Sequence, residues 1–357
     1  MFNPCGASHA YQHCRRKFLG MDLYGWNMDP SSFILRPLLL RGLWFSLYCL
    51  LSSSSAEGDT TVNALFIGNS YTARHDLAQS VGAFVEANES GLDFQPYTVI
   101  YAGSTLADHW RLGSANFVGI NDLTIAEQKT TIASLEKAAA APRDAYARSA
   151  LKRHQKLLAN LEESRATWDL VILQSYRDDL DGAKSRYHQF APKFVKAARD
   201  HGAAKVILYE TTPNTQNAEP LTTPPDPAPI LEKAKSIAAL ADQLDVSVAP
   251  MSLVALRCQE QRPDLTLRFI NDAHLNQVLS YLTACTLYAA IFEQSPEGIP
   301  VDSITDIRFF KKEDGTIDKT KDRNGDPITR KFSDKDRLQL QRIAWEAWTE
   351  FEGMRAK

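Results

Sequence analysis

Ser70 is the residue whose type and surroundings point most directly to chemistry. It follows an apolar run, residues 64–67, through Gly68 and Asn69, and the residues after it are typical of a helix. A serine in this position lies at the carboxyl end of a strand, where open α/β sheets bind ligands. Backbone N–H groups at a helix N-terminus can also stabilise an oxyanion. Ser70 is therefore a candidate nucleophile, and the alternative is a plain strand-to-helix turn in which Ser70 caps the helix.

His274 is the candidate partner of this serine. It stands just before a predicted helix, and Asn271 and Asp272 come shortly before it. A serine nucleophile needs an imidazole within hydrogen-bond reach, and a third group must fix the tautomer of the ring. The carboxyl ends of parallel strands meet at one edge of the sheet. We therefore expect Ser70, at one strand end, and His274, in a late loop, to meet there.

From residue 61 onward, segments typical of strands alternate with segments typical of helices. The predicted strands cover residues 62–67, 94–101, 167–174, 205–210 and 246–251, and the predicted helices cover residues 76–88, 187–201, 229–244 and 276–293. Repeated alternation of this kind predicts a parallel sheet with helices on both faces. We interpret residues 57–357 as one domain.

Two segments interrupt the alternation. Residues 123–165 are rich in Ala, Lys, Glu and Leu and predict a helical hairpin, which is either a lid or an outer insertion. Residues 304–332 predict a β-hairpin around residues 322–326, and a terminal helix follows and ends near residue 352. The carboxylates of residues 322–326 lack the full spacing of an EF-hand, so a solvated turn is favoured over a calcium site.

The blocks that follow successive predicted strands resemble those of the SGNH, or GDSL-type, hydrolases. Gly68-Asn69-Ser70 resembles the Gly-Asp-Ser block that carries the nucleophile of that family, with Asn69 in place of Asp. Gly103 matches the glycine after the second strand, whose N–H donates to the oxyanion, and His274 matches the histidine of the last block. The Gly-Asn-Ser variant resembles a little-characterised branch of the family.

Two blocks depart from the family pattern. The third block, usually Gly-x-Asn-Asp, reads Leu-Gln-Ser-Tyr-Arg-Asp over residues 173–178. Some branches have a glutamine there, which implies Gln174 as a side-chain donor to the oxyanion. In the last block an Asp precedes the histidine by three residues, whereas here Asn271 stands at that distance and Asp272 is one residue closer. Either residue could orient the ring of His274, although an amide stabilises an imidazolium less than a carboxylate does.

The resemblance covers residues 62–293 and implies a three-layer α/β/α sandwich with a mostly parallel, flavodoxin-like sheet. It implies a serine hydrolase that cleaves carboxylic esters, with His274 as general base and the N–H groups of Ser70 and Gly103 as oxyanion donors. O-acetyl groups on carbohydrate are the first substrates to test. No cofactor and no metal is expected. The alternatives are a non-catalytic carbohydrate-binding or structural module on the same fold, and a hydrolase of lipid or thioester acyl groups.

Further residues near these blocks are candidates for substrate binding. Asn69 and Tyr71 flank the serine. Trp110 could form an apolar or sugar-stacking wall with His109 as a polar rim, and the alternative is that Trp110 packs its helix onto the sheet. Arg177 follows the third strand and could hold an anionic or hydroxylated substrate. The alternative for Arg177 is a solvated salt bridge within its loop.

The N-terminal segment is typical of an export signal. Arg36 and Arg41 precede an apolar stretch over residues 42–51, and residues 54–56, Ser-Ser-Ala, resemble a cleavage site. We therefore expect residues 1–56 to be an extension with a signal peptide, and the mature protein to be secreted or periplasmic without stable membrane insertion. The alternatives are an uncleaved anchor and an irregular extension.

Composition limits the remaining classes of function. The chain of 357 residues is 44% hydrophobic, which is ordinary for a globular protein with a core. Its net charge is −3, and no basic stripe with interleaved aromatic residues is present, so a nucleic-acid partner is not expected. Cleavage after residue 56 would leave two cysteines, Cys258 and Cys285. They could pair in an oxidising compartment, but we expect them to be buried free thiols. The sequence leaves the oligomeric state open.

Overall fold

The computed structural model describes residues 60–89, 91–141, 144–177, 179–180, 184–211 and 213–355. The predicted signal peptide therefore lies outside the described residues, as do residues 142–143 of the predicted helical hairpin.

Five parallel strands form the central sheet in the order β2-β1-β3-β4-β5. Their bounds are β1 Thr60–Gly68, β2 Leu92–Ile100, β3 Leu170–Gln174, β4 Lys205–Tyr209 and β5 Ser247–Ala249. Each strand lies where the alternating pattern predicted one, and the α/β fold is confirmed. The strand order is the flavodoxin-like one: β2 lies on one side of β1, and β3, β4 and β5 follow on the other side, so the order of connection reverses between β1 and β3. Ligands bind in the crevice outside such a reversal point.

The centre of the sheet is buried on both faces. Residues 64–67 of β1 and all five residues of β3 are buried. Parallel strands covered on both faces are expected to read as continuous apolar runs, and those of this chain do. The buried centre fixes where β1 and β3 end along the sheet. It therefore also fixes the positions of Ser70 and Gln174.

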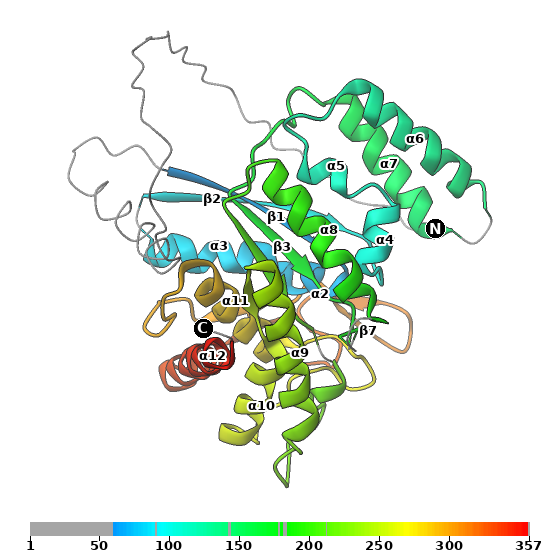
Figure 1. The fold of residues 1–357 in the computed structure, drawn as a ribbon. Helices are drawn as coiled ribbons and strands as arrows, with labels where there is room; N and C mark the ends of the chain where they lie inside the picture. The colour runs from blue at the N-terminus through cyan, green and yellow to red at the C-terminus, as the bar shows by residue number, and fades with distance from the viewer. Residues whose placement is uncertain are drawn as a thin grey trace, which may run out of the picture. The chain divides into compact units, whose positions relative to one another are not determined.

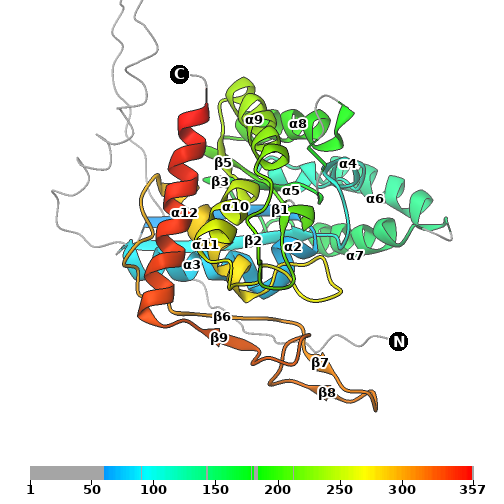
Figure 2. The same ribbon diagram turned by 90° about the horizontal axis from the view of Figure 1, so that it is seen from below.

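Helices cover both faces of the sheet (Figures 1 and 2). The helices α3 (Leu77–Asn88) and α11 (Gln277–Phe292) pack together on one face. The helices α4 (Leu106–Arg111), α8 (Arg186–Asp200) and α9 (Ala228–Leu244) cover the other face, and α5 (Ala115–Val118) packs on α8. The helix α11 is buried on all sides because α12 (Asp334–Met354) covers it from outside the sandwich. Cys285 in α11 is a buried free thiol, as is Cys258.

The end predicted for the fifth strand is wrong, and the helix that follows it was missed. The strand predicted over residues 246–251 stops at Ala249, and α10 (Met251–Gln261) begins directly afterwards. The cause is Pro250, which lacks the N–H that would continue the ladder. Its carbonyl instead accepts hydrogen bonds from the N–H groups of Leu253 and Val254, at 3.1 Å each, and so begins the helix.

Two additions extend the sandwich. The first is the helical hairpin of α6 (Ile125–Ala139) and α7 (Ala145–Ala159), which occupies the predicted insertion. The second, here called the β arm, comprises residues 303–331 and extends from the sandwich in Figure 2. In it β6 (Ser303–Thr305) pairs with β9 (Thr329–Lys331), and β7 (Phe310–Lys311) pairs with β8 (Ile317–Asp318). The single predicted hairpin is thus two antiparallel pairs.

The predicted solvated turn at residues 322–326 is built around a buried carboxylate. Asp322 is 1% exposed, and its Oδ1 accepts hydrogen bonds from the N–H groups of Asn324 and Asp326. Its Oδ2 accepts one from Nε2 of Gln277 at the start of α11. These bonds tie the β arm to the sandwich.

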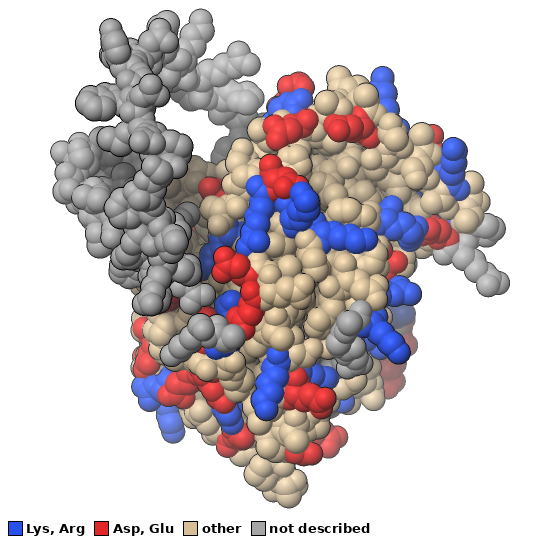
Figure 3. Space-filling model, in the orientation of Figure 1, with Lys and Arg blue, Asp and Glu red and all other residues tan. Residues whose placement is uncertain are grey.

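The surface carries both signs of charge. Figure 3 shows basic and acidic side chains interspersed over the face that it draws. Among the described helices, none combines the length and the apolar character needed to cross a membrane.

Candidate active site

Ser70, His274 and Asp272 form a connected chain of hydrogen bonds. The hydroxyl of Ser70 lies 2.6 Å from Nε2 of His274, and Nδ1 of His274 lies 2.5 Å from Oδ1 of Asp272. With the proton of the neutral ring on Nδ1, the Ser70 hydroxyl donates to Nε2, and the Nδ1–H donates to Asp272. Two of these residues are 204 positions apart in the chain, so the fold and not local sequence brings them together.

The turn after β1 presents the hydroxyl of Ser70. The short helix α2 (Ser70–Ala73) has Asn69 as its N-cap, and Oδ1 of Asn69 accepts a hydrogen bond from the N–H of Tyr71 at 3.1 Å. Asn69 therefore does the capping that the alternative interpretation assigned to Ser70. Asn69 is 2% exposed and donates from Nδ2 to the carbonyl of Ser104 at 3.0 Å. Its predicted contact with substrate does not fit this burial, and it positions the serine turn instead.

Gln174 stabilises this turn from the end of β3. Its Oε1 accepts hydrogen bonds from the N–H of Asn69 at 2.9 Å and from Oγ1 of Thr72 at 2.6 Å. Its Nε2 donates to Oδ1 of Asn69 at 2.8 Å and to the carbonyl of Ser175 at 2.9 Å. An amide nitrogen has only two N–H groups, and both are used inside the protein. The predicted role of Gln174 as a side-chain donor to the oxyanion does not fit this geometry.

Gly68 is required by the closeness of Gln174. A Cβ on Gly68 would lie 2.4 Å from Oε1 of Gln174 and 2.5 Å from Oγ1 of Thr72. Real side chains do not approach this closely, so the block needs a glycine for space and not for an unusual backbone angle.

Two backbone donors stay available for an oxyanion. Neither the N–H of Ser70 nor that of Gly103 has an acceptor among the residues that the structure describes. Gly103 has φ +75°, a left-handed conformation that favours glycine. A Cβ there would lie 3.0 Å from the hydroxyl of Tyr146, which is in α7. The helical insertion therefore reaches the loop that carries Gly103.

The geometry of residues 271–274 selects Asp272 over Asn271 as the group that orients the histidine. Asn271 takes φ +56°, a left-handed conformation that asparagine tolerates. The turn brings the carboxylate of Asp272 back onto its own loop, where Oδ1 also accepts the backbone N–H of His274 at 3.1 Å. Tyr71 supports the same loop, because its ring stacks on His274 at 5.3 Å and its hydroxyl donates to the carbonyl of Ala273. Tyr71 is 5% exposed and contacts the histidine loop.

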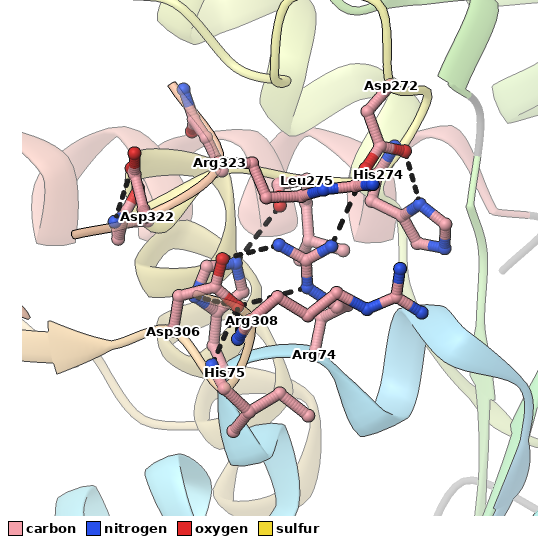
Figure 4. Close-up of polar contacts among 12 residues, drawn as sticks. Arg74, His75, Asp272, His274, Leu275, Asp306, Arg308, Asp322 and Arg323 are labelled. Atoms are coloured by element: carbon pink, nitrogen blue, oxygen red, sulfur yellow. Dashed lines mark hydrogen bonds and ion pairs between the residues drawn. The ribbon is translucent and has the colours of Figure 1, made fainter. Parts of the chain in front are cut away.

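A buried arginine lies behind the triad (Figure 4). Arg74 is 1% exposed, and its Nη1 lies 3.7 Å from Oδ2 of Asp272. Its other nitrogens contact Asp306, with Nε–Oδ1 at 3.0 Å and Nη2–Oδ2 at 2.5 Å. Arg323 also donates to Oδ2 of Asp272. Asp306 and Arg323 belong to the β arm, so this appended segment completes the surroundings of the triad. None of these three residues was singled out from the sequence.

Burial and nearby positive charges keep the ring of His274 neutral. Burial is the largest cause, and together with the positive charges of Arg74, Arg308 and Arg177 it lowers the pKa of His274 to about 4, although Asp306 acts to raise it. A neutral imidazole is the form that can accept the proton of a serine.

The remaining residues predicted near the substrate, Trp110, His109 and Arg177, lie in three different surroundings. The ring of Trp110 is exposed and meets Phe194 of α8 edge-on at 5.2 Å, so this ring contact joins its helix to a neighbouring helix and not to the sheet. His109 is 1% exposed and bonds to the carbonyl of Gly68 at 2.9 Å and to Ser114 at 2.8 Å, which makes it structural and not a polar rim. Arg177 is exposed, and its guanidinium lies 5.5 Å from the ring centre of Tyr176.

Comparison with known proteins gives similarity of structure only. No protein-family model matches the chain, and no curated protein sequence matches it. A DUF4886 family protein from Bacteroides uniformis is similar at TM-score 0.44 and 15% identity, covering 81% of this chain and 95% of that one. A protein from Slackia heliotrinireducens, proposed to be an SGNH hydrolase, is similar at TM-score 0.37 and 16% identity. The match covers 65% of this chain and 100% of that one. A gut microbial diltiazem-metabolizing enzyme is similar at TM-score 0.31 and 10% identity, covering 67% of this chain and 48% of its own.

Proposed function

We propose that this protein is a serine hydrolase that cleaves carboxylic esters. The observation that carries the proposal is the hydrogen-bonded chain from Ser70 Oγ through the His274 ring to Asp272, at 2.6 Å and 2.5 Å. A nucleophile, a base and a group that orients the base are the minimum that acyl transfer needs. The two free backbone donors at Ser70 and Gly103 supply the place for the oxyanion.

The reaction proceeds in two halves. Ser70 Oγ attacks the acyl carbon while Nε2 of His274 takes its proton, and the N–H groups of Ser70 and Gly103 hold the oxygen that becomes negative. His274 returns the proton to the leaving alcohol, which leaves an acyl-serine. A water then attacks the acyl carbon and gives its proton to His274, and the acid departs as that proton returns to Ser70.

The non-catalytic alternative rested on the changed spacing between the acidic residue and His274 and on the missing Gly-x-Asn-Asp block. The contact of Asp272 with the ring supports the hydrolase on the first of these points. For the substrate, O-acetyl groups on carbohydrate are the first to test. Arg36, Arg41 and the apolar stretch that follows them support export, so we propose that the protein is secreted or periplasmic.

Hydrolysis of p-nitrophenyl acetate by the chain that begins at residue 57 tests the proposal. We expect turnover that Ser70→Ala and His274→Ala each remove. Ser134→Ala, on the exposed side of α6, and His201→Ala, at the end of α8, are the matched controls and should retain it. Equal rates for the unaltered protein and Ser70→Ala would contradict the proposal.

A further inference from the structure

The arginines around the triad differ in whether their guanidiniums are paired. Asp272 and Asp306 contact the guanidiniums of Arg74 and Arg323. Arg308 lies beside them, but its side chain has no ion pair or hydrogen bond within the described part of the chain. The guanidinium of Arg308 is therefore the unpaired one of these three among the described residues.

The position of Arg308 is fixed by the buried carboxylate. The N–H groups of Ile307 and Arg308 both donate to Oδ1 of Asp306, at 2.7 Å and 3.2 Å. The backbone of Arg308 is thus attached to the same carboxylate that holds Arg74. In Figure 4 the side chain of Arg308 runs beside Arg74 toward the ring of His274.

Arg177 lies in the loop that follows β3. It follows Gln174, whose amide contacts the serine turn, and its carbonyl accepts a hydrogen bond from Oγ1 of Thr211 at 3.4 Å. Its nearest described acid in sequence, Asp179, is engaged elsewhere, because both oxygens of Asp179 accept N–H groups at the start of α8, at 3.1 Å and 3.0 Å. The guanidinium of Arg177 stacks on Tyr176 and has no ion pair among the described residues.

Two exposed guanidiniums near one nucleophile suit the binding of an anionic group. A guanidinium stays charged at all physiological pH values and pairs with carboxylate, sulfate or phosphate through two parallel hydrogen bonds. Figure 4 draws the side chain of Arg308 beside the ring of His274, and the positive charges of Arg308 and Arg177 both lower the pKa of that ring, so both also act on whatever lies against it. Positive charge beside a reaction site concentrates anionic substrates there.

Given the hydrolase function proposed above, on which this inference rests, we propose that Arg308 and Arg177 form an anion-binding subsite beside Ser70 and His274. The esters that the protein cleaves best then carry a negatively charged oxyacid group close to the scissile bond. Arg308 and Arg177 determine specificity in this account, whereas Arg74 and Arg323 are held by Asp272 and Asp306.

A set of matched esters tests the subsite. The set comprises neutral p-nitrophenyl acetate, mono-p-nitrophenyl succinate with a carboxylate on the acyl side, and nitrophenyl acetates with a carboxylate or a sulfonate on the phenol ring. We expect one or more charged esters to have a kcat/KM about tenfold or more above that of the neutral ester, and added salt to reduce the difference. Arg308→Gln and Arg177→Gln should each reduce that ratio about tenfold. Arg148→Gln, exposed on α7, should leave it unchanged.

The charged esters also distinguish the kinds of anion. Preference for the succinate ester means that the preferred anionic group lies on the acyl side of the ester. Preference for a charged phenol means that it lies on the alcohol side. Whichever of the carboxylate and the sulfonate raises kcat/KM more identifies the oxyacid group that the subsite prefers. The proposal is overturned if no charged ester exceeds the neutral one, or if the preference survives both substitutions.

Binding without turnover separates this inference from the proposed function. Calorimetry with the Ser70→Ala protein measures the affinity for succinate against that for neutral succinamide. We expect succinate to bind more tightly, and Arg308→Gln in the same background to weaken it about tenfold. Equal affinities would refute the subsite even if esters are hydrolysed. Tight succinate binding with no ester hydrolysis would refute the proposed function alone.

Discussion

Asp306 holds Arg74 at two points, with Nε–Oδ1 at 3.0 Å and Nη2–Oδ2 at 2.5 Å, and both side chains are 2% exposed or less. The pair joins the helix turn after the nucleophile to the β arm, 232 residues later in the chain. The same guanidinium faces Asp272 at 3.7 Å, so the position of the triad carboxylate depends on a segment outside the alternating fold.

Breaking this buried pair is expected to destabilise the protein strongly. Asp306→Asn leaves the guanidinium of Arg74 buried without a full counter-charge, which costs about 3–5 kcal/mol for such pairs. Chemical denaturation measures the loss. Asp302→Asn removes an exposed carboxylate whose contact with Lys331 is 3.4 Å, and it should change the free energy of unfolding by less than about 1 kcal/mol. Similar values for the two variants would show that Arg74 does not need Asp306.

The pH dependence of hydrolysis follows from the environment of His274. As a general base the ring must be neutral, and its pKa is lowered from 6.5 to about 4. Activity should therefore be retained as the pH falls below 6.5, and kcat/KM should decline only as the ring gains a proton near pH 4. Arg308→Gln removes a positive charge that lowers this pKa, so its acid limb should move to higher pH. An inflection near pH 6.5 in the unaltered protein, with no movement in Arg308→Gln, would contradict this account of the site.

Asp272 and Asn271 can be separated by substitution. Asp272→Asn removes the charge that stabilises the imidazolium, and the loss in kcat should be on the order of 10³–10⁴. Asn271→Gly keeps the left-handed conformation at φ +56° and should retain most of the activity. The reverse pattern in steady-state kinetics would mean that Asn271 orients the ring.

Gln174 is predicted to act on stability as well as rate. Gln174→Ala leaves the N–H of Asn69 and the hydroxyl of Thr72 without their buried acceptor, which costs about 1–3 kcal/mol for each group. Thermal unfolding should therefore show a clearly lower Tm together with reduced turnover. If turnover falls about 10²–10³-fold while the Tm is unchanged, Gln174 is an oxyanion donor after all.

The sequence predicted the parts of the site that follow regular strands. Ser70 could be found because β1 is a continuous buried strand that ends at Gly68, and His274 because it stands before the apolar helix α11. The role of Gln174 could not be predicted, because the strand pattern shows where a side chain leaves the sheet but not which partners it meets.

The sequence pattern also could not predict the residues that surround the triad carboxylate. Asp306 and Arg323 lie in an arm of two- and three-residue strands with little hydrophobic periodicity. Their contacts with Arg74 and Asp272 depend on how that arm folds back on the sandwich. Arg74 itself reads as an ordinary polar residue of a short helical turn, and only its 1% exposure marks it as unusual.

Covalent labelling tests most directly whether Ser70 is an activated nucleophile, and it does not require knowledge of the substrate. The chain from residue 57 would be treated with a fluorophosphonate, and the modified residue located by mass spectrometry. We predict a single adduct on Ser70 that is absent from His274→Ala and unchanged in His201→Ala. No adduct, or an adduct that forms on Ser70 equally well without His274, would contradict the proposal that these two residues form a catalytic pair.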